Sequence, residues 1–325
     1  MSVRFAVVGC GTAANHIHLP GLRSAGAEVT VFASRSLASA EATCEAWGSG
    51  AVEARWEDAV VRDDVDAIVI ATPNAQHHAV AMAALGAGKH VLVDKPMART
   101  VAEADEMIAA ADRAATVLVP FQNTRFAPPF SAAAQKVQEG AIGEVTGFRV
   151  AFGHAGPQVW APRATWFFER ATAGGGCLMD LGVHAIDLVR AVTGDGVTHV
   201  SAILHGKAGD VETDAQLVLR LRTGAIGSVH ASWSAQPGPD HQLTVIGTLG
   251  TLHLDTRTPL TLVTASGERA RVELTDEPAS PLLELLAAVA GERAPAVTAA
   301  DGRASLAVVE AAYRSAATGQ LEEVR

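Results

Sequence analysis

Two hydrophobic patterns alternate over residues 1–120 of the chain. One consists of short runs that are apolar throughout and rich in β-branched residues, and the other of Ala-rich stretches with helical spacing. Strands without a polar face are typical of a parallel sheet that helices cover on both sides. Their alternation with helices predicts a doubly wound α/β domain. The expected strands are Val3–Val8, Glu28–Ala33, Ala67–Ala71, His90–Val93 and Val117–Pro120, and the expected helices are Ala13–Ser24, Leu37–Trp47, Gln76–Leu85 and Val101–Ala114.

The pattern changes after Phe121. Several strand-like runs follow one another from Val197 to Leu274, and turns rather than helices separate them, which indicates a large open, mainly antiparallel sheet in an α+β domain. We therefore expect two closely docked domains, residues 1–121 and 122–325, with the C-terminal helices able to pack back on the first. The other elements expected here are a helix at Ala127–Glu139, a strand at Glu144–Phe152, a loop at Gly153–Gly176, and helices at Leu178–Val192, Leu282–Ala290 and Asp301–Thr318, the last with Asp301 as N-cap.

Composition narrows the class of protein. The 325 residues are 49% hydrophobic and 18% charged, which is enough apolar material for packed cores. The formal charge of −10 argues against a general binder of nucleic acid or anionic membranes. No apolar run approaches the ~20 residues of a membrane span, and the first strand begins too early for a signal peptide, so we expect a cytoplasmic protein.

A glycine-rich turn opens the chain. Gly9, Gly11, Thr12, Ala13 and Ala14 lie in a GxGxxA sequence that follows the first strand and begins a helix. The first glycine allows a tight turn, the second lets the backbone approach a pyrophosphate, and the small third residue allows close packing of helix on strand. The positive end of the helix favours the phosphates. These residues predict a dinucleotide site in a Rossmann domain.

The end of the second strand bears on the choice of cofactor. An NAD-specific site carries an acidic residue there, which accepts hydrogen bonds from the ribose hydroxyls. This chain has Ser34, Arg35 and Ser36 instead. The Arg35 guanidinium can pair with a 2′-phosphate, and the serine hydroxyls can donate to it. NADP(H) is therefore the expected cofactor and NAD(H) the alternative, unless Arg35 is an ordinary solvated turn residue.

Two later segments carry residues suited to proton transfer. Asp94 and Lys95 follow an apolar strand, and the carboxyl ends of parallel strands face the ligand crevice in this architecture. Asp180 and His184 lie four positions apart after three glycines, on one face of the expected helix. A carboxylate beside an imidazole, with a lysine as cation, can transfer protons. An Asp–His pair at this spacing is also common as a purely structural hydrogen bond.

Taken together, these segments resemble the Gfo/Idh/MocA oxidoreductases over the whole chain. The resemblance rests on the glycine-rich turn, on Thr72-Pro73-Asn74 with His77, on Asp94-Lys95-Pro96 and on the GGGxxxDxGxHxxD segment at 174–187. It implies that Lys95, Asp180 and His184 are catalytic, that the Thr72–Asn74 segment, His77, Asp94 and Lys95 line the cofactor site, and that the Lys95–Pro96 bond can be cis. Asp94 departs from the glutamate usual in the family. The resemblance also implies a homodimer or homotetramer formed through the open sheet.

The implied reaction is hydride transfer between a nicotinamide and a secondary alcohol or ketone of a sugar, cyclitol or related compound. His184 is our first choice as acid and base, with Lys95 polarising the carbonyl oxygen, and a lysine proton donor is the alternative. A glycoside hydrolase or isomerase that retains its cofactor, and a non-catalytic nucleotide sensor, are the competing functions.

The loop before the glycines is expected to line the substrate pocket. Trp faces stack on the C–H faces of sugars, and Arg or Asn side chains bond hydroxyls or a carboxylate. The tryptophans could equally pack the domain junction. His16 and His18 form an HxH with no evident third ligand, so no metal site is expected. The candidate substrate residues are Asn123, Arg125, His154, Trp160, Arg163, Trp166 and Phe167.

Overall fold

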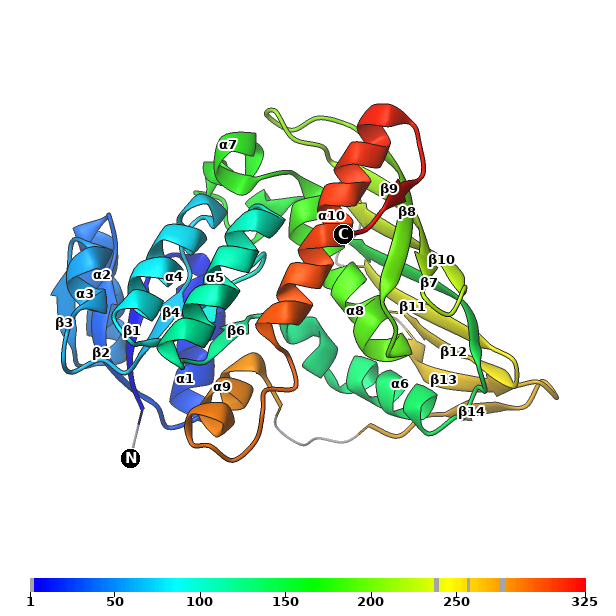
Figure 1. Ribbon diagram of the computed structural model, residues 1–325, viewed down its shortest axis with the longest axis horizontal. Coiled ribbons are helices and arrows are strands. Elements are labelled where there is room, and N and C mark those ends of the chain that lie inside the picture. The colour runs from blue at the N-terminus through cyan, green and yellow to red at the C-terminus, as the bar shows by residue number, and fades with distance from the viewer. Residues whose placement is uncertain (1–2, 237–239, 256–257, 275–278) are drawn as a thin grey trace. The chain divides into compact units, whose positions relative to one another are not determined.

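The computed structural model describes residues 3–236, 240–255, 258–274 and 279–325. The chain forms two compact units. Unit 1 comprises Met1–Gln122 and Ala279–Arg303, and unit 2 comprises Asn123–Pro278 and Ala304–Arg325. The long helix α10 (Ala299–Thr318) therefore begins in unit 1 and ends in unit 2 (Figure 1). Among the described residues, no helix is long and apolar enough to span a membrane.

Unit 1 is built on a parallel sheet of six strands in the order β3-β2-β1-β4-β5-β6 (Figure 1). The order runs outward from β1 in both directions, so right-handed crossovers place the connecting helices on opposite faces. This is the doubly wound Rossmann arrangement that the sequence predicts. The strands are β1 (Arg4–Val8), β2 (Glu28–Ala33), β3 (Ala51–Glu53), β4 (Ala67–Ile70), β5 (His90–Val93) and β6 (Leu118–Pro120). The helices and helical turns are η1 (Ala14–His18), α1 (Leu19–Ser24), α2 (Leu37–Trp47), α3 (Trp56–Val60), η2 (Asn74–Gln76), α4 (His77–Gly86), α5 (Val101–Ala114) and α9 (Pro281–Val289).

The start of α10 differs from the expectation. The helix begins at Ala299, and Thr298 rather than Asp301 is the capping residue. The Thr298 hydroxyl accepts the backbone N–H of Asp301 (3.2 Å), while the Asp301 carboxylate accepts the N–H of Thr298 (3.0 Å). This reciprocal pair is a capping box, in which the acidic residue lies in the first turn instead of before it.

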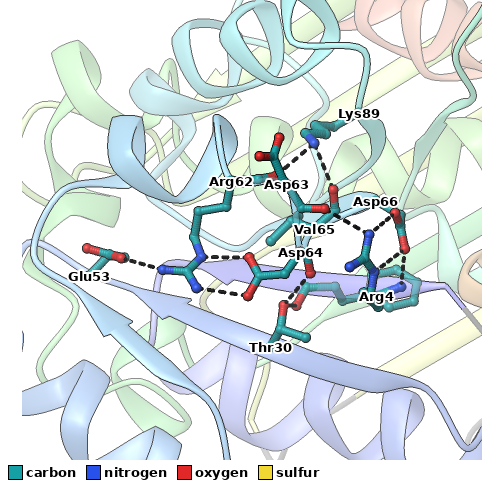
Figure 2. Close-up of polar contacts among 10 residues, drawn as sticks. Arg4, Thr30, Glu53, Arg62, Asp63, Asp64, Val65, Asp66 and Lys89 are labelled. Carbon is teal, nitrogen blue, oxygen red and sulfur yellow. Dashed lines mark hydrogen bonds and ion pairs between the residues drawn. The ribbon is translucent and has the colours of Figure 1, made fainter.

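Hydrogen bonds and ion pairs of charged side chains stabilise the loop that precedes β4, at the amino end of the sheet (Figure 2). Arg4 donates to both carboxylate oxygens of Asp66 at 2.8–2.9 Å, and Arg62 does the same to Asp64 at 2.8 Å. Lys89 donates to the backbone carbonyls of Arg62 and Val65. These contacts lie at the strand ends opposite to those where ligands bind in such sheets, so they stabilise the fold and leave the carboxyl ends free for chemistry.

Unit 2 is built on a nine-stranded sheet in the order β14-β13-β12-β11-β7-β10-β9-β8-β15 (Figure 1). Neighbouring strands are antiparallel except β7 and β10, which are parallel. Helix α8 packs on β7 and β10, and α6 packs on α8, so these helices cover one face. The strands are β7 (Val145–Gly153), β8 (Val197–His205), β9 (Asp214–Leu221), β10 (Ile226–Ser232), β11 (Asp240–Gly247), β12 (Gly250–Asp255), β13 (Thr258–Thr264), β14 (Arg269–Arg271) and β15 (Glu322–Glu323). The helices and helical turns are η3 (Asn123–Phe126), α6 (Pro128–Gln138), η4 (Pro157–Val159), η5 (Thr165–Phe168), α7 (Arg170–Ala173), η6 (Leu178–Gly182) and α8 (Val183–Thr193).

Candidate active site

The glycine-rich turn lies between β1 and η1. Gly9 has φ +96°, and a Cβ there would lie 2.5 Å from the carbonyl oxygen of Ala71, so only glycine fits. A Cβ on Gly11 would meet no described atom within 4 Å, which leaves its backbone open to a ligand. Ala14 is fully buried, as the close packing of helix on strand requires. The turn therefore has the shape that a pyrophosphate needs.

The helix after this turn is not regular. The sequence predicts one helix over Ala13–Ser24, but the residues Ala14–His18 form a π-helical turn, in which the N–H of Leu19 bonds to the carbonyl of Ala14. Such turns insert one extra residue into a helix and are frequent at functional sites. The extra residue changes the face of the helix on which His18 lies relative to regular helical spacing.

His18 contacts the Asp94 side chain. Its Nε2 lies 3.3 Å from Asp94 Oδ2, while Asp94 Oδ1 accepts the backbone N–H of Lys95 at 2.7 Å. Burial by itself would raise the pKa of the Asp94 carboxyl, but the hydrogen bond and charge of His18, with Lys95 beside it, lower that pKa to about 2. Asp94 is therefore an anion next to Lys95, at the carboxyl end of β5.

His77 connects two loops, one after β4 and one after β5, at the carboxyl end of the unit 1 sheet. It is fully buried, and its ring nitrogens lie 2.8 Å from the carbonyl oxygens of Thr72 and Pro96. The Lys95–Pro96 peptide bond is cis, as the resemblance implies. Burial lowers the pKa of His77. The His77 ring is not exposed, so its contacts in the structure are with the backbone that it positions.

The Thr72 hydroxyl is buried and has no hydrogen-bond partner among the described residues. Thr72 follows β4, the neighbour of β1 in the sheet, so it lies at the point where the strand order reverses. Ligands of open α/β sheets bind at this point. The open Gly11 backbone and the unpartnered Thr72 hydroxyl both fit a dinucleotide.

The residues after β2, the strand next to β1, include the candidates for contact with the adenosine end of a dinucleotide. Arg35 is exposed, and the structure gives its side chain no hydrogen bond or ion pair within the described ranges. Ser34 accepts the N–H of Ser36 at 3.3 Å, and the Ser36 hydroxyl caps α2 by accepting the N–H of Ser39. Ser36 is thus already used by the helix, while the Arg35 guanidinium is free to bind an anion.

In unit 2, the GGGxxxDxGxHxxD segment forms a second π-helical turn. The N–H of Val183 bonds to the carbonyl of Leu178. Asp180 lies within this turn and His184 follows it in α8, whereas the sequence predicts both on one face of a regular helix. Asp180 is 6% exposed. His184 is half-buried, and its Nδ1 lies 3.1 Å from the Thr124 hydroxyl.

The contacts of Asp180 include residues that the sequence analysis did not connect with it. Trp233 donates its indole N–H to Asp180 Oδ2 at 3.0 Å, and His154 Nε2 lies 3.6 Å from the same oxygen. His154 follows β7 and Trp233 follows β10, and these parallel strands end side by side, with Gly153 opposite Ser232. The parallel pairing brings both side chains to one edge of the sheet, and no local pattern reveals that pairing.

Two of the candidate substrate residues lie just before α6. Arg125 makes a bidentate ion pair with Asp187, and the two side chains are 11% and 1% exposed. The guanidinium thus neutralises a carboxylate that would otherwise be buried without a counter-charge. Asn123 is exposed.

The loop between β7 and η6 carries an aromatic cluster. Trp166 stacks on Phe167 with ring centroids 3.8 Å apart, and Trp160 meets the edge of Phe167 at 5.3 Å. Trp160 is 38% exposed and Arg163 is exposed, so both can reach solutes. Phe167 is buried. The described part of the chain contains no group of three or more His, Cys, Asp or Glu side chains arranged to hold a metal ion.

Two models of known protein families together match most of the chain. Residues 3–121 match the model described as an oxidoreductase family with an NAD-binding Rossmann fold, and residues 130–253 match the GFO/IDH/MocA C-terminal domain. The two matches follow one another in the order in which the domains occur here.

Individual proteins are similar over the full length. A 1,5-anhydro-D-fructose reductase of Ensifer adhaerens is 33% identical over 99% of this chain and 98% of its own. The structure of GenD2 from gentamicin A biosynthesis, in complex with NAD, is 30% identical, with a TM-score of 0.86 over 100% of this chain and 97% of its own. An oxidoreductase domain protein of Kribbella flavida superposes with a TM-score of 0.89 at 26% identity, over 100% and 99% of the two chains.

Proposed function

Because the chain belongs to the GFO/IDH/MocA oxidoreductase family, we propose that it transfers a hydride between a nicotinamide dinucleotide and a secondary alcohol or ketone of a polyhydroxy compound. The substrate class is a sugar, a cyclitol or a related ketone, in agreement with the anhydro-sugar reductase that is 33% identical. The observation that carries the proposal is the anionic Asp94 beside Lys95 at the ligand-binding edge of the unit 1 sheet.

The residues of unit 1 suit a dinucleotide. The open backbone at Gly11 and the start of η1 would hold the pyrophosphate, and Thr72, Pro73 and Asn74 would line the next part of the site. When bound, the nicotinamide supplies or takes up the hydride. Lys95, held through its backbone by Asp94, would lie against the reacting end of this ligand.

We further propose that NADP(H) is preferred to NAD(H). Arg35 is an exposed guanidinium after β2 and has no ion pair in the described structure, so it can bind a 2′-phosphate through two parallel hydrogen bonds. No acidic side chain follows β2 directly to accept from a free 2′-hydroxyl. The preference differs from the NAD found in the GenD2 structure and rests on Arg35.

In this proposal a residue of unit 2 donates the proton that the reaction requires. Reduction of a ketone leaves an alkoxide that needs a proton, and His184 is the proposed donor, since an imidazole titrates near the working pH. Thr124 orients the His184 ring, and Trp233 orients the Asp180 carboxylate. Lys95, as a cation, would stabilise the developing charge on the oxygen. The alternative assigns the proton to Lys95 and leaves His184 an orienting role.

The substrate contacts are proposed for the loop after β7. The exposed Trp160 ring and the accessible part of the half-buried Trp166 ring would stack on the C–H side of a ring. Arg163 and Asn123 would bond its hydroxyls or a carboxylate. Arg125 is assigned a supporting role, because its guanidinium is already paired with Asp187.

The face of the nine-stranded sheet opposite α8 is proposed to join two copies of the chain. Ile203 on β8 is 73% exposed and Val218 on β9 is 49% exposed. They are diagonal neighbours, because Ile203 pairs with Gln216 and Val218 with Ser201. Two apolar side chains next to each other on an open sheet favour burial against a partner.

A side-by-side fluorescence titration with NADPH and NADH tests the proposal, after any copurified nucleotide has been released and identified. Tighter binding of NADPH, and its oxidation by ketoses or ketocyclitols, would support the NADP-dependent reductase. A retained nicotinamide nucleotide with no net consumption would instead favour a hydrolase or isomerase that oxidises its substrate transiently. Binding without turnover of any such substrate would favour a sensor.

A further inference from the structure

Three consecutive backbone amides at the start of η6 all donate to one residue, Glu212. Glu212 Oε1 accepts the N–H of Gly176 at 2.9 Å and that of Leu178 at 3.2 Å, and the carbonyl oxygen of Glu212 accepts the N–H of Cys177 at 3.1 Å. The first amides of a helix have no partners within it, and its N-terminus is positive. Glu212 therefore caps, from the segment just before β9, the helix that carries Asp180 and His184.

A tyrosine and an arginine complete the surroundings of this carboxyl group. Tyr313 on α10 donates its hydroxyl to Glu212 Oε1 at 2.8 Å, and Arg170 Nη2 lies 3.5 Å from Oε2. The Arg170 guanidinium also lies over the Tyr313 ring, 5.4 Å from its centroid. Glu212 is 5% exposed, so these donors replace the water that it loses.

The same contacts explain two of the three glycines. A Cβ on Gly175 would lie 1.8 Å from the Tyr313 hydroxyl oxygen, and a Cβ on Gly176 would lie 1.9 Å from the carbonyl oxygen of Glu212. A residue with a Cβ at either position would therefore clash with Tyr313 or Glu212. The backbone of the glycine segment lies directly against the tyrosine and the glutamate.

We propose that Glu212 and Tyr313 are positioning residues, which hold the 176–178 backbone and thereby place Asp180 and His184 for the reaction. Neither residue has a part in the proposed chemistry itself. Asp180 lies two residues beyond the last anchored amide, and its own N–H already bonds to the carbonyl of Gly176, so a shift of this backbone moves the carboxylate. The kinetic part of the proposal rests on the proposed function, whereas the backbone anchor does not.

Glu212→Gln tests the anchor with two independent readouts. Hydrogen exchange of the Gly176 and Leu178 amides is expected to become faster by about tenfold or more, because a neutral amide oxygen is the weaker acceptor. The kcat is expected to fall by about tenfold to a hundredfold, as for a misplacement of about 1 Å, with the dissociation constant of the nicotinamide nucleotide unchanged.

Asp195→Asn is the matched control. Asp195 also belongs to unit 2, and its carboxylate accepts the N–H groups of Gly196 (2.7 Å) and Thr223 (2.9 Å), away from the glycine segment. This variant should leave amide exchange at 176–178 and kcat as in the wild type. Equal exchange rates at 176–178 in wild type and Glu212→Gln would overturn the anchor, whether or not the wild type has oxidoreductase activity.

Tyr313→Phe gives a milder test if Glu212→Gln does not fold. It should lower kcat without changing nucleotide binding. In addition, it should partly rescue Gly175→Ala, because it removes the nearest atom, while the ring Cζ at 2.7 Å limits the rescue. It should not rescue Gly176→Ala, whose obstacle is a backbone atom. Wild-type kcat in both Glu212→Gln and Tyr313→Phe, from an active parent enzyme, would overturn the positioning role and leave the proposed function intact.

Discussion

Trp233 donates its indole N–H to the Asp180 carboxylate across 3.0 Å, and each of the two residues is 6% exposed. A buried carboxylate that loses a donor bears an uncompensated desolvation cost. This contact links the end of β10 to Asp180, one of the proposed proton-transfer residues.

Trp233→Phe keeps an aromatic ring but removes the donor. We expect the free energy of unfolding to fall by about 1–3 kcal/mol and kcat to fall with little change in nucleotide affinity. Urea unfolding and steady-state kinetics measure the two effects. Trp47→Phe is the control, since the described structure shows this indole packed near Phe32 and Arg23 without a hydrogen bond from its N–H. Equal effects of the two substitutions would contradict a special role for Trp233.

Lys95→Ala and His184→Ala are each expected to abolish turnover while nucleotide binding is largely kept. Loss of a general acid lowers a rate by about 10²–10⁴-fold. The pH dependence of the residual rate identifies the donor, because it changes shape when the titrating donor is removed. Lys89→Ala serves as the control, since Lys89 holds two backbone carbonyls at the amino end of the sheet and should affect stability alone. Wild-type kcat in either active-site variant would refute its assignment.

Arg35→Asp should reverse the preference for the cofactor. The carboxylate repels a 2′-phosphate and can accept from a free 2′-hydroxyl, so NADPH affinity should fall and NADH affinity rise. Fluorescence titration gives both dissociation constants. Arg55→Asp introduces the same change of charge at another exposed arginine of unit 1 and should leave the ratio as it is. An unchanged NADPH affinity in Arg35→Asp would remove the case for NADP.

Asp94 predicts a pH dependence of stability. Its pKa is about 2 in the folded chain, below the value of about 3.9 for an unfolded Asp, so its ionised form stabilises the fold above about pH 4. This contribution, at most about 2–3 kcal/mol, is lost as the pH falls from about 4 to about 2. Asp94→Asn should therefore be less stable than the wild type at neutral pH, and the difference should close by about pH 2.

Urea unfolding across this range measures the difference. Asp112→Asn is the control, because Asp112 is exposed on α5 and its carboxylate has no ion pair in the described residues. A stability gap for Asp94→Asn that stays constant from pH 7 to pH 2 would argue against the depressed pKa.

Ile203→Lys and Val218→Lys should dissociate an oligomer formed through the open sheet. Burial of a charged side chain at such an interface costs far more than exposure of an apolar one. Sedimentation velocity gives the state of each variant. Val61→Lys, at another exposed apolar residue, in unit 1, should leave the oligomer intact. A wild type that sediments as a monomer would contradict the proposed oligomer, and variants that remain oligomeric would place its interface elsewhere.

The hydrophobic pattern predicted the Rossmann sheet well, because a buried parallel strand is apolar throughout. Helices α2 and α5 have the predicted bounds, and five of the six strands were expected. The pattern does not predict β3, since Ala51–Glu53 is too short and too polar to stand out. It predicts regular helix across both π-helical turns, because one extra residue in a turn leaves an apolar pattern almost unchanged.

The sequence indicates candidate catalytic residues where they lie in short motifs, as Lys95 and His184 do. Thr124 and Trp233 lie in no such motif, and their contacts are with partners 60 and 53 residues away in sequence. The pairing of Asp94 with His18 spans 76 residues and depends on the π-helical turn η1. Sequence patterns report local geometry, and the strand register that joins distant segments is decided by the packing of the whole unit.

Helix α9 packs on β5 and β6, although it follows all but one strand of the other unit in the chain. Unit 1 is therefore discontinuous, and a fragment that stops at Gln122 leaves the α9 side of these strands exposed to water. During synthesis most of the nucleotide-binding unit emerges before unit 2, yet it can be completed only after α9 has left the ribosome. Until then the side of β5 and β6 that α9 covers stays open on the nascent chain, and a chaperone can bind it there.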